Sequence, residues 1–299
     1  MTTVKDLVEQ AEKEGVTLSD VVLQRESEST GTRKEELLEH MYRNLSVMRD
    51  SCREGEDPNL RSESGLSGGQ SAKMMERARS GDNLCGPFFG KALARALAVS
   101  ECNACMGRIV ASPTAGSCGI LPAAVLTTME EKNLPEETAV KALFTAAGIG
   151  MAIAEGASIS GAQGGCQAEV GAASAMAAAA ITEMMGGTPD MCAHACAMAL
   201  KNVLGLVCDP VAGLVEVPCI KRNAMGVSNA LAAAEMALCG IESRIPADEV
   251  IWAMRRVGDS MPGSLRETAE GGLAATPTGR RLAEEILRGK KAEKTQETP

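Results

Sequence analysis

The chain has 299 residues, of which 45% are hydrophobic and 23% are charged, so it is long and apolar enough to bury a substantial core. Its formal net charge of −9 argues against nucleic acid as the main partner. Aromatic residues make up only 2%, so the core must be built mainly from alanine, leucine, valine, isoleucine and methionine.

The cysteine content and the absence of targeting patterns predict a cytoplasmic protein. No basic start is followed by an apolar run, so no signal peptide is recognisable. The most apolar stretch, residues 170–181, is too short and too rich in alanine to cross a bilayer of about 30 Å, so no membrane partner is expected. Eleven cysteines in such a chain indicate free thiols, metal ligands or redox groups more than disulfides.

The first 53 residues predict a polar N-terminal arm of short helices. Amphipathic patterns cover residues 3–15, 17–29 and 33–52. The second begins at a sequence that resembles a capping box, with Thr17 and Asp20 as its ends. We expect residues 1–53 to cap the main domain or to dock against a partner.

Residues 54–288 predict an all-α domain, rich in alanine and glycine, in which loops at helix ends carry candidate metal ligands. A Gly/Ser-rich loop over residues 54–69 leads into apolar helices, and no run of residues alternates as a strand does. Polar residues 289–299 predict a disordered tail. Helices are predicted at 70–80, 88–110, 120–131, 136–155, 167–185, 189–205, 220–240, 246–261 and 279–288.

Three cysteines lie in turns and are the first candidates for metal ligands. Cys166 follows two glycines, Cys208 precedes Asp-Pro, and Cys219 follows a proline. Three thiolates without a fourth leave a coordination position open, which distinguishes a catalytic centre from a structural one. Their spacing, C-x41-C-x10-C, is neither that of a zinc finger nor that of a ferredoxin, and three buried loop cysteines remain the alternative.

Helix positions distinguish these three cysteines from the others. Cys166 and Cys219 each come directly before or at the start of a predicted helix, where the helix dipole lowers a thiol pKa. The pairs Cys102/Cys105 and Cys192/Cys196 instead lie within predicted helices. We interpret those pairs as small core residues.

Two loops of small residues are candidates for substrate binding. Ser67, Gly68 and Gly69 come directly before a helix, where free backbone N–H groups can hold a substrate carboxylate. Thr114 and Ser117 lie in a second loop that offers hydroxyl groups. The alternatives are a flexible connector for the first loop and a tight helix–helix corner for the second.

Glu101 and Asn103 lie one helical turn before the second loop and are expected to face the same cavity.

A general base is hard to find in this chain. His40 and His194 are its only histidines, and both are interpreted as structural. Lys73 and Lys201 are candidates, and the base can also come from another chain. The pair Ser71 and Lys73 leaves a Ser–Lys hydrolase open as an alternative function.

Together these segments resemble the alpha chain of the iron–sulfur-dependent L-serine dehydratases, also called L-serine ammonia-lyases. The resemblance runs nearly end to end. Its most specific parts are the two long segments that contain the three turn cysteines. The motifs are Ser64 to Gly69, Pro113 to Ser117, Gly164 to Gly171, Cys208 to Cys219, Arg222-Asn223 and Glu267 to Ala269.

The resemblance implies a [4Fe–4S] cluster held by Cys166, Cys208 and Cys219, and deamination of L-serine to pyruvate and ammonia without pyridoxal phosphate. It also implies a separate beta-type chain that carries a Ser-rich, His-containing motif. The candidate catalytic residues are then Ser67, Lys73 and Thr114. A pyridoxal-phosphate-dependent amino-acid lyase remains the second alternative beside the Ser–Lys hydrolase.

Overall fold

The structure is a computed structural model that describes residues 2–296, with side chains described as far as Arg288. Within that range the fold is all-α, as predicted: it has thirteen α-helices and no strand, and one isolated bridge joins Cys208 to Arg266. The helices are α1 (Val4–Glu14), α2 (Leu18–Thr30), α3 (Lys34–Gly55), α4 (Gln70–Arg79), α5 (Gly86–Ala104), α6 (Ile120–Glu131), α7 (Glu136–Gly156), α8 (Gly161–Gly164), α9 (Ala172–Met184), α10 (Pro189–Lys201), α11 (Cys219–Leu238), α12 (Ala247–Ser260) and α13 (Pro277–Gln296). Short helical turns are η1 (Ala115–Ser117), the π-helical η2 (Gln167–Gly171), η3 (Val211–Gly213), η4 (Gly263–Leu265) and η5 (Gly272–Ala275).

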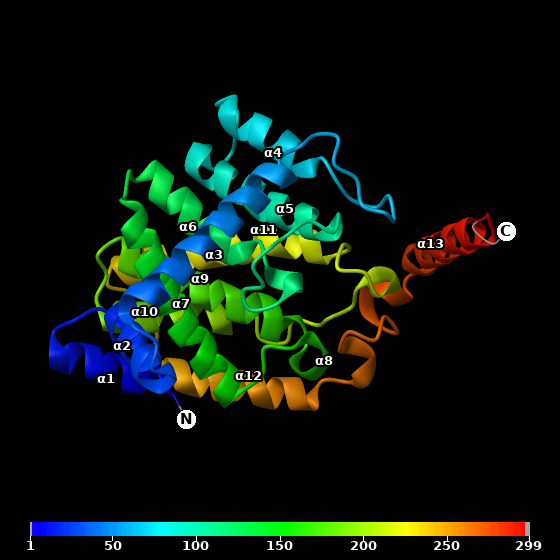
Figure 1. The fold of residues 1–299 in the computed structure, drawn as a ribbon. Helices are drawn as coiled ribbons and strands as arrows, with labels where there is room; N and C mark the ends of the chain where they lie inside the picture. Colours follow the sequence, from blue (N-terminus) through cyan, green and yellow to red (C-terminus); the bar gives the residue numbers. More distant parts are fainter. Residues whose placement is uncertain (1, 297–299) are drawn as a thin grey trace.

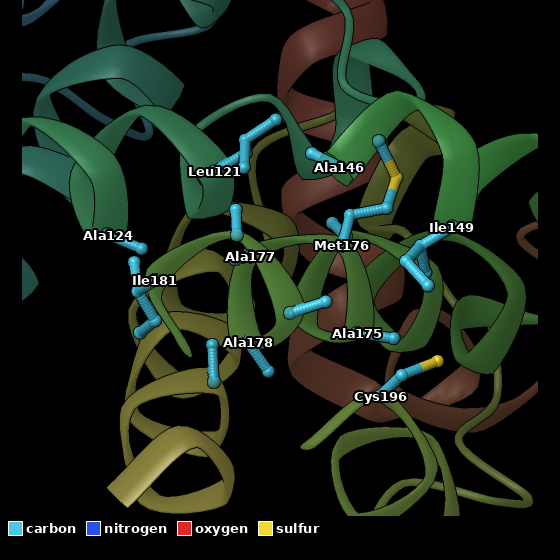
Figure 2. Packing of buried hydrophobic residues seen from close by; sticks show 14 of the residues in the cluster. Leu121, Ala124, Ala146, Ile149, Ala175, Met176, Ala177, Ala178, Ile181 and Cys196 are labelled. Atoms are coloured by element: carbon cyan, nitrogen blue, oxygen red, sulfur yellow. The ribbon is translucent and has the colours of Figure 1, made fainter. Parts of the chain in front are cut away.

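Helix α9 is the centre of the core. Its sequence is mostly alanine, the best helix former, and it is hydrophobic on all sides, which is typical of a fully buried helix. Helices α6, α7, α10 and α11 surround it. Figure 2 shows Ala124 of α6 next to Ile181 of α9, and Ile149 of α7 directed towards α9. Small side chains on α9 let its neighbours approach closely.

The N-terminal helices are part of the same core. Leu7, Leu18 and Leu45 are each 1% exposed or less and belong to one hydrophobic cluster with Ile149 of α7. Helix α2 packs on α7, and α3 crosses the front of the molecule against α5 (Figure 1). The three predicted helices are confirmed, but their apolar faces are covered by the main domain.

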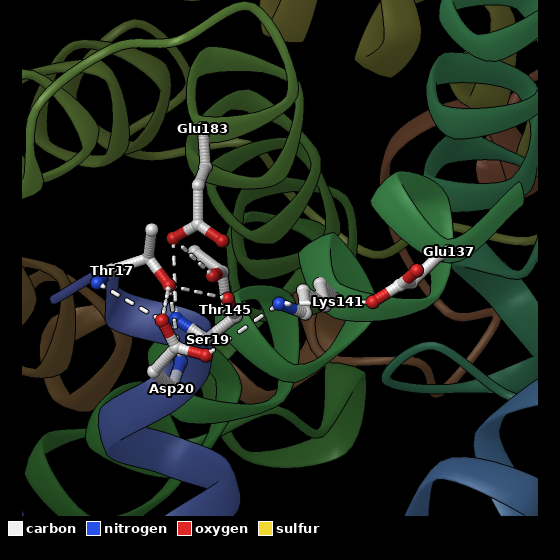
Figure 3. A network of polar contacts seen from close by, with 7 residues as sticks. All are labelled: Thr17, Ser19, Asp20, Glu137, Lys141, Thr145 and Glu183. Carbon is white, nitrogen blue, oxygen red and sulfur yellow. Dashed lines mark hydrogen bonds and ion pairs between the residues drawn. The ribbon is translucent and has the colours of Figure 1, made fainter. Parts of the chain in front are cut away.

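A polar network fastens α2 to α7 and α9 (Figure 3). The carboxylate of Glu183 accepts hydrogen bonds from the backbone N–H of Ser19 at 3.2 Å and from Thr145 Oγ1 at 2.7 Å. The predicted capping box at the start of α2 is confirmed, with Thr17 as its N-cap and Asp20 three residues on.

Two predicted helices end four or more residues earlier than expected. The helix predicted for 88–110 ends at Ala104, because Met106 has a φ of +64° and Gly107 lies so close to Cys102 that a Cβ there would be 2.4 Å from its sulfur. The helix predicted for 189–205 ends at Lys201. In both cases apolar residues beyond the helix extended the predicted pattern.

Helix α7 is long and apolar enough to cross a membrane by length and composition, and it is the one helix of that kind in the described part of the chain. In the structure 61% of its most apolar window is buried against other helices, which is the environment of a core helix.

The C-terminal helix α13 projects from the body of the molecule (Figure 1). Its backbone is helical from Pro277 to Gln296, so the helix continues past Gly289, where the sequence predicts the start of a disordered tail. Residues 297–299 lie outside the described residues. The division into an arm, a helical domain and a tail stays a prediction.

Candidate functional site

The three turn cysteines occupy the helix ends and the loop that the sequence predicts. Cys166 is the N-cap of η2, which runs on into α9, and Cys219 is the first residue of α11. Cys208 lies in an extended loop, where its N–H donates to Leu265 O at 2.9 Å and its carbonyl accepts from Glu267 N at 2.8 Å. The loop that carries Cys208 is therefore held by the segment after α12.

The three thiols are electrostatic neighbours. Burial is the largest cause that raises their pKa values, to about 11 for Cys166, to about 12 for Cys219 and further above the ordinary value for Cys208. The charge of Cys166 raises the pKa of the other two thiols further. The expected lowering by helix N-termini is thus outweighed by loss of water, and the thiols stay protonated at neutral pH unless a cation replaces the proton.

The three thiols do not form a recognisable site for a single metal ion. Among the described side chains, no group of three or more His, Cys, Asp or Glu is arranged to hold one metal ion. The site is therefore a set of neighbouring thiols at loop ends, and its use as a ligand set stays a prediction.

Arg222 fixes the loop around Cys208. Its guanidinium donates to Val207 O at 2.8 Å and pairs with Asp209 Oδ1 at 2.9 Å. The other carboxylate oxygen of Asp209 accepts from Leu273 N at 2.7 Å. Arg222 also hydrogen-bonds to the thiol of Cys166 and lowers its pKa, so one cation joins two of the cysteine-bearing segments.

Asn223, the next residue on α11, joins the Thr114 loop to the turn at Cys219. It is 1% exposed, and its amide donates to Gly116 O at 2.8 Å and to Cys219 O at 3.0 Å. Its Oδ1 accepts from Gly119 N at 2.9 Å. Both N–H groups and the oxygen of this amide are hydrogen-bonded to backbone groups. These bonds hold the Thr114 loop in one conformation, which its small residues alone would not do.

Glu169 lies between the Thr114 loop and Cys208. Its carboxylate accepts from Thr114 Oγ1 at 2.7 Å, and Cys208 Sγ lies 3.9 Å from its other oxygen. Thr114 in turn is 3.3 Å from the hydroxyl of Ser117. Burial is the main cause that raises the pKa of Glu169, the hydrogen bond from Thr114 opposes it, and Glu267 raises it further.

The predicted substrate loop is engaged with a second carboxylate, that of the buried Glu216. Ser62 and Ser64 each donate to Glu216 at 2.7 Å, and Ser67 donates to the same carboxylate. Ser67 is 4% exposed and Glu216 is 5% exposed. The hydroxyl of Ser67 therefore anchors its loop to the segment between Cys208 and Cys219.

The glycines of this loop serve its internal packing. Gly68 and Gly69 have φ values of +123° and +71°. A Cβ at Gly68 would lie 2.0 Å from Leu60 O, and one at Gly69 would lie 2.6 Å from Pro58 O. Glycine is required at both positions because the chain folds back on itself there. This requirement holds whether or not a substrate binds at the loop.

The free N–H groups expected at the start of α4 are not free. Glu101, which is fully buried, accepts from the backbone N–H groups of Gln70 at 3.0 Å and of Ser71 at 3.1 Å. A carboxylate of the chain itself thus fills the anion position that was predicted for substrate. Asn103 does face the second loop, since its amide donates to Ala115 O at 3.3 Å.

The alternatives based on lysine receive no support. Ser71 is fully buried and donates its hydroxyl to Ala94 O at 3.0 Å, whereas Lys73 is exposed on α4. No hydrogen bond joins the two among the described residues, as a Ser–Lys pair requires. Lys201 donates to Ser243 Oγ at 3.0 Å, outside the cysteine loops.

Both histidines have positions that agree with a structural role. His40 is exposed on α3. His194 accepts from Ser243 N at 3.2 Å through Nδ1, and its Nε2 is 3.2 Å from Asp190. Neither ring contacts the cysteine loops.

Sequence reasoning missed the polar residues that join these loops. Glu169, Glu216, Arg222 and Asn223 all lie inside the motifs that resemble the family, but none received a role. A signal was present for Glu169, which is three residues after Cys166 and so shares its side of a helical turn.

The chain is similar in sequence to a family of known proteins. Residues 13–274 match the family described as Serine dehydratase alpha chain, and the chain belongs to that family. It is 54% identical over 286 residues to a probable L-serine dehydratase alpha chain from Bacillus subtilis, with 96% of this chain and 95% of the relative covered. It is 43% identical over 288 residues to the L-serine dehydratase alpha chain of Peptoniphilus asaccharolyticus, with 96% of this chain and 99% of the relative covered.

A third relative is a longer protein. The L-serine dehydratase of Streptomyces coelicolor is 46% identical over 181 residues, which are 60% of this chain but 40% of that protein.

Proposed function

We propose that this chain is the alpha chain of a cytoplasmic L-serine ammonia-lyase, which converts L-serine to pyruvate and ammonia. The relatives that match almost the whole chain bear the names of L-serine dehydratase alpha chains. The observation that carries the proposal is the neighbourhood of Cys166, Cys208 and Cys219. The three thiols come from separate helix ends and loops; Cys166 and Cys208 are buried and Cys219 is partly buried. All three interact electrostatically with one carboxylate, that of Glu169.

The donor set fits a [4Fe–4S] cluster better than a single metal ion. Thiolates are the usual ligands of iron–sulfur clusters, and the ligands of a cubane stand apart around its corners. Three cysteines on separate helix ends and loops are a donor set of this kind. Cys166, Cys208 and Cys219 would hold the cluster and leave one iron without a protein ligand.

When bound, such a cluster supplies a Lewis acid that stabilises the departing hydroxide. The overall reaction removes the α-proton and the β-hydroxyl of serine as water. The aminoacrylate that results tautomerises to an imine, which water hydrolyses to pyruvate and ammonia.

The residues of this chain hold the loops of the proposed site in place. Asn223 holds the Thr114 loop against the turn of Cys219, and Arg222 holds the Cys208 loop near Cys166. Glu169 joins the hydroxyl of Thr114 to the side of Cys208. We propose Thr114, which is half-buried, as the substrate-binding hydroxyl of this loop, with Ser117 behind it.

The base that removes the α-proton is proposed to come from a beta-type partner chain. Both histidines of this chain lie outside the cysteine loops, and Lys73 is exposed on α4. The longer relative from Streptomyces coelicolor has 60% of its length outside the match, which leaves room for a second part within one chain. We propose that a separate chain supplies that part here.

Anaerobic purification tests the proposal. The chain should carry iron and acid-labile sulfide, and pyruvate should form from L-serine when a beta-type chain is added. Full activity of an iron-free preparation would contradict the cluster. Activity that appears only on addition of pyridoxal phosphate would favour the alternative lyase.

A further inference from the structure

A cavity of about 380 Å³ opens among α3, α4, α5 and α6, and none of its residues belongs to the cysteine loops. Its size is within the range of small-molecule pockets, about 300–1,000 Å³. Each helix contributes side chains one turn apart. The lining residues are Arg49, Cys52 and Arg53 of α3, Glu56 directly after it, Met75 and Arg79 of α4, Lys91 and Arg95 of α5, and Leu126 and Glu130 of α6.

The lining is strongly cationic. Five of its side chains are arginine or lysine and two are glutamate, in a chain whose formal net charge is −9. Cations gathered in a concave site with a low-dielectric wall attract anions far more than the net charge of the molecule suggests.

Three of the cations are held in place by carboxylates on α6 and α7. An arginine presents five N–H donors in a planar fork, so a guanidinium with one carboxylate partner keeps donors for a second anion. The pairs are Arg49 with Glu136 at 2.7 Å, Lys91 with Glu131 at 2.6 Å, and Arg95 with Glu130.

The other two cations are available. The side chain of Arg79 makes no hydrogen bond or ion pair with any residue that the structure describes. The ion pair of Arg53 with Asp50 is 3.8 Å long and both side chains are largely exposed, which is the weakest class of ion pair. Arg53 and Arg79 line the same cavity from two helices.

The floor of the cavity is apolar. Cys52, Met75 and Leu126 are 4%, 5% and 1% exposed. An inorganic ion makes no use of such a floor, whereas a small carbon skeleton buries against it.

We propose that this cavity binds a small phosphate monoester. Its phosphate lies between Arg53 and Arg79, with the free donors of Arg49 and Arg95 around it, and its carbon skeleton covers the apolar floor. The planar guanidinium of arginine can donate two parallel hydrogen bonds to two oxygens of a phosphate. A phosphate dianion also neutralises several cations more completely than a single carboxylate does. The site is separate from the cysteine loops and does not rest on the proposed lyase activity.

Calorimetric titration of the full chain with glycerol 3-phosphate at constant ionic strength tests this proposal. Saturable binding is expected. Arg79→Ala should weaken it by about tenfold or more, because a hydrogen bond to a charged group is lost. Arg79→Lys should lie between the two, since the charge stays and the fork is lost.

Arg77→Ala is the matched control. Arg77 lies on the same helix, is exposed, and pairs with Asp82 at 3.6 Å outside the cavity. It should change the affinity by about twofold at most, because salt screens distant surface charges. Circular dichroism checks that each variant is folded.

Four results would overturn the proposal. They are the absence of saturable binding, equal losses in Arg79→Ala and Arg77→Ala, displacement of glycerol 3-phosphate by L-serine, and equal affinity for acetate. Equal affinity for inorganic phosphate and glycerol 3-phosphate would overturn the assignment of a monoester, because the apolar floor would then contribute nothing.

Discussion

The continuous helix made by η2 and α9 carries a partly buried carboxylate near each end, and the two ends differ in what they hold together. Glu183 accepts from Ser19 and Thr145, which lie on helices whose apolar faces already pack against each other. Glu169 accepts from Thr114 and approaches Cys208, which lie on loops between helices. Burial raises the pKa of both carboxyl groups.

Apolar packing positions the backbone at the Glu183 end of this helix, and polar contacts do so at the Glu169 end. At the Glu183 end the apolar cluster fixes α2 and α7, and the carboxylate adds to an arrangement that exists without it. At the Glu169 end the loops are short of apolar side chains, so the hydrogen bonds of Glu169, Arg222 and Asn223 determine where the thiols lie. Buried polar networks of this kind are where function is most often found.

The largest expected effect is at the cysteines themselves. Cys166→Ser, Cys208→Ser and Cys219→Ser should each abolish bound iron and serine turnover together, because three thiolates are proposed to hold one cluster. Iron and sulfide analysis of anaerobic preparations measures the first, and pyruvate formation with the beta-type chain measures the second.

Cys239→Ser is the control for these variants, because Cys239 is a free and exposed cysteine. It should keep iron content and turnover. A turn-cysteine variant that kept full iron and activity would exclude that residue as a ligand.

The next effect is at Glu169. Glu169→Gln keeps the size of the side chain but removes the charge that holds Thr114, and should lower turnover about 10- to 100-fold, as loss of partners around metal ligands does. Thr114→Val should act in the same direction. Because the two residues share one hydrogen bond, the double variant should be less impaired than the product of the single effects predicts.

Thr145→Val is the matched control at the other end of the helix, since Thr145 donates to Glu183 as Thr114 donates to Glu169. It should leave turnover unchanged. Equal losses of activity in Thr145→Val and Thr114→Val would show that the hydrogen bond at Glu169 matters no more for turnover than the one at Glu183.

Glu216 offers a third, smaller effect. Glu216→Ala leaves the hydroxyls of Ser62, Ser64 and Ser67 without their common acceptor, which should lower the free energy of unfolding by about 1–3 kcal/mol. Hydrogen exchange of residues 60–69 should become faster while the helices around α9 stay protected. Unchanged exchange in that loop would show that its own glycine turns hold it.

Much of the fold was predictable from the sequence, because helices depend on local pattern. The predicted helix 120–131 has the observed bounds, and the cysteines at helix ends follow from neighbouring glycine and proline. The polar contacts of the site were not predictable. Ser67 and Glu216 are 149 residues apart, and the N-terminus of α4 receives its carboxylate from Glu101, 31 residues later.

That difference also changes one experiment suggested by the sequence. The sequence suggests Gly68→Val as a test of substrate binding, because a side chain there would block the close backbone approach expected at the loop of Ser67, Gly68 and Gly69. Since a Cβ at Gly68 would meet Leu60 O at 2.0 Å, the variant distorts the loop itself and cannot report on a ligand. Long-range contacts therefore decide what a substitution tests, even where the local pattern is correctly recognised.

The smallest effect is on the pH dependence of stability at Glu183. Burial raises the pKa of this carboxyl group in the folded chain, so the folded state binds its proton more tightly than the unfolded state. Its contribution to stability is therefore greatest below the unfolded pKa of about 4.3, and falls as the pH rises through the raised folded value. Glu183→Gln removes this dependence and should change the free energy of unfolding by about 1 kcal/mol or less.

Urea unfolding at a series of pH values measures this change, with Glu137→Gln as the control. Glu137 is exposed on α7 and lies 3.9 Å from Lys141, so its loss removes the same charge without the burial (Figure 3). If wild type and Glu183→Gln lost stability in parallel as the pH rose, burial of the ionised Glu183 carboxylate would not destabilise the fold. The Glu169 and Glu183 ends of the helix would then differ only in the residues that surround each carboxylate.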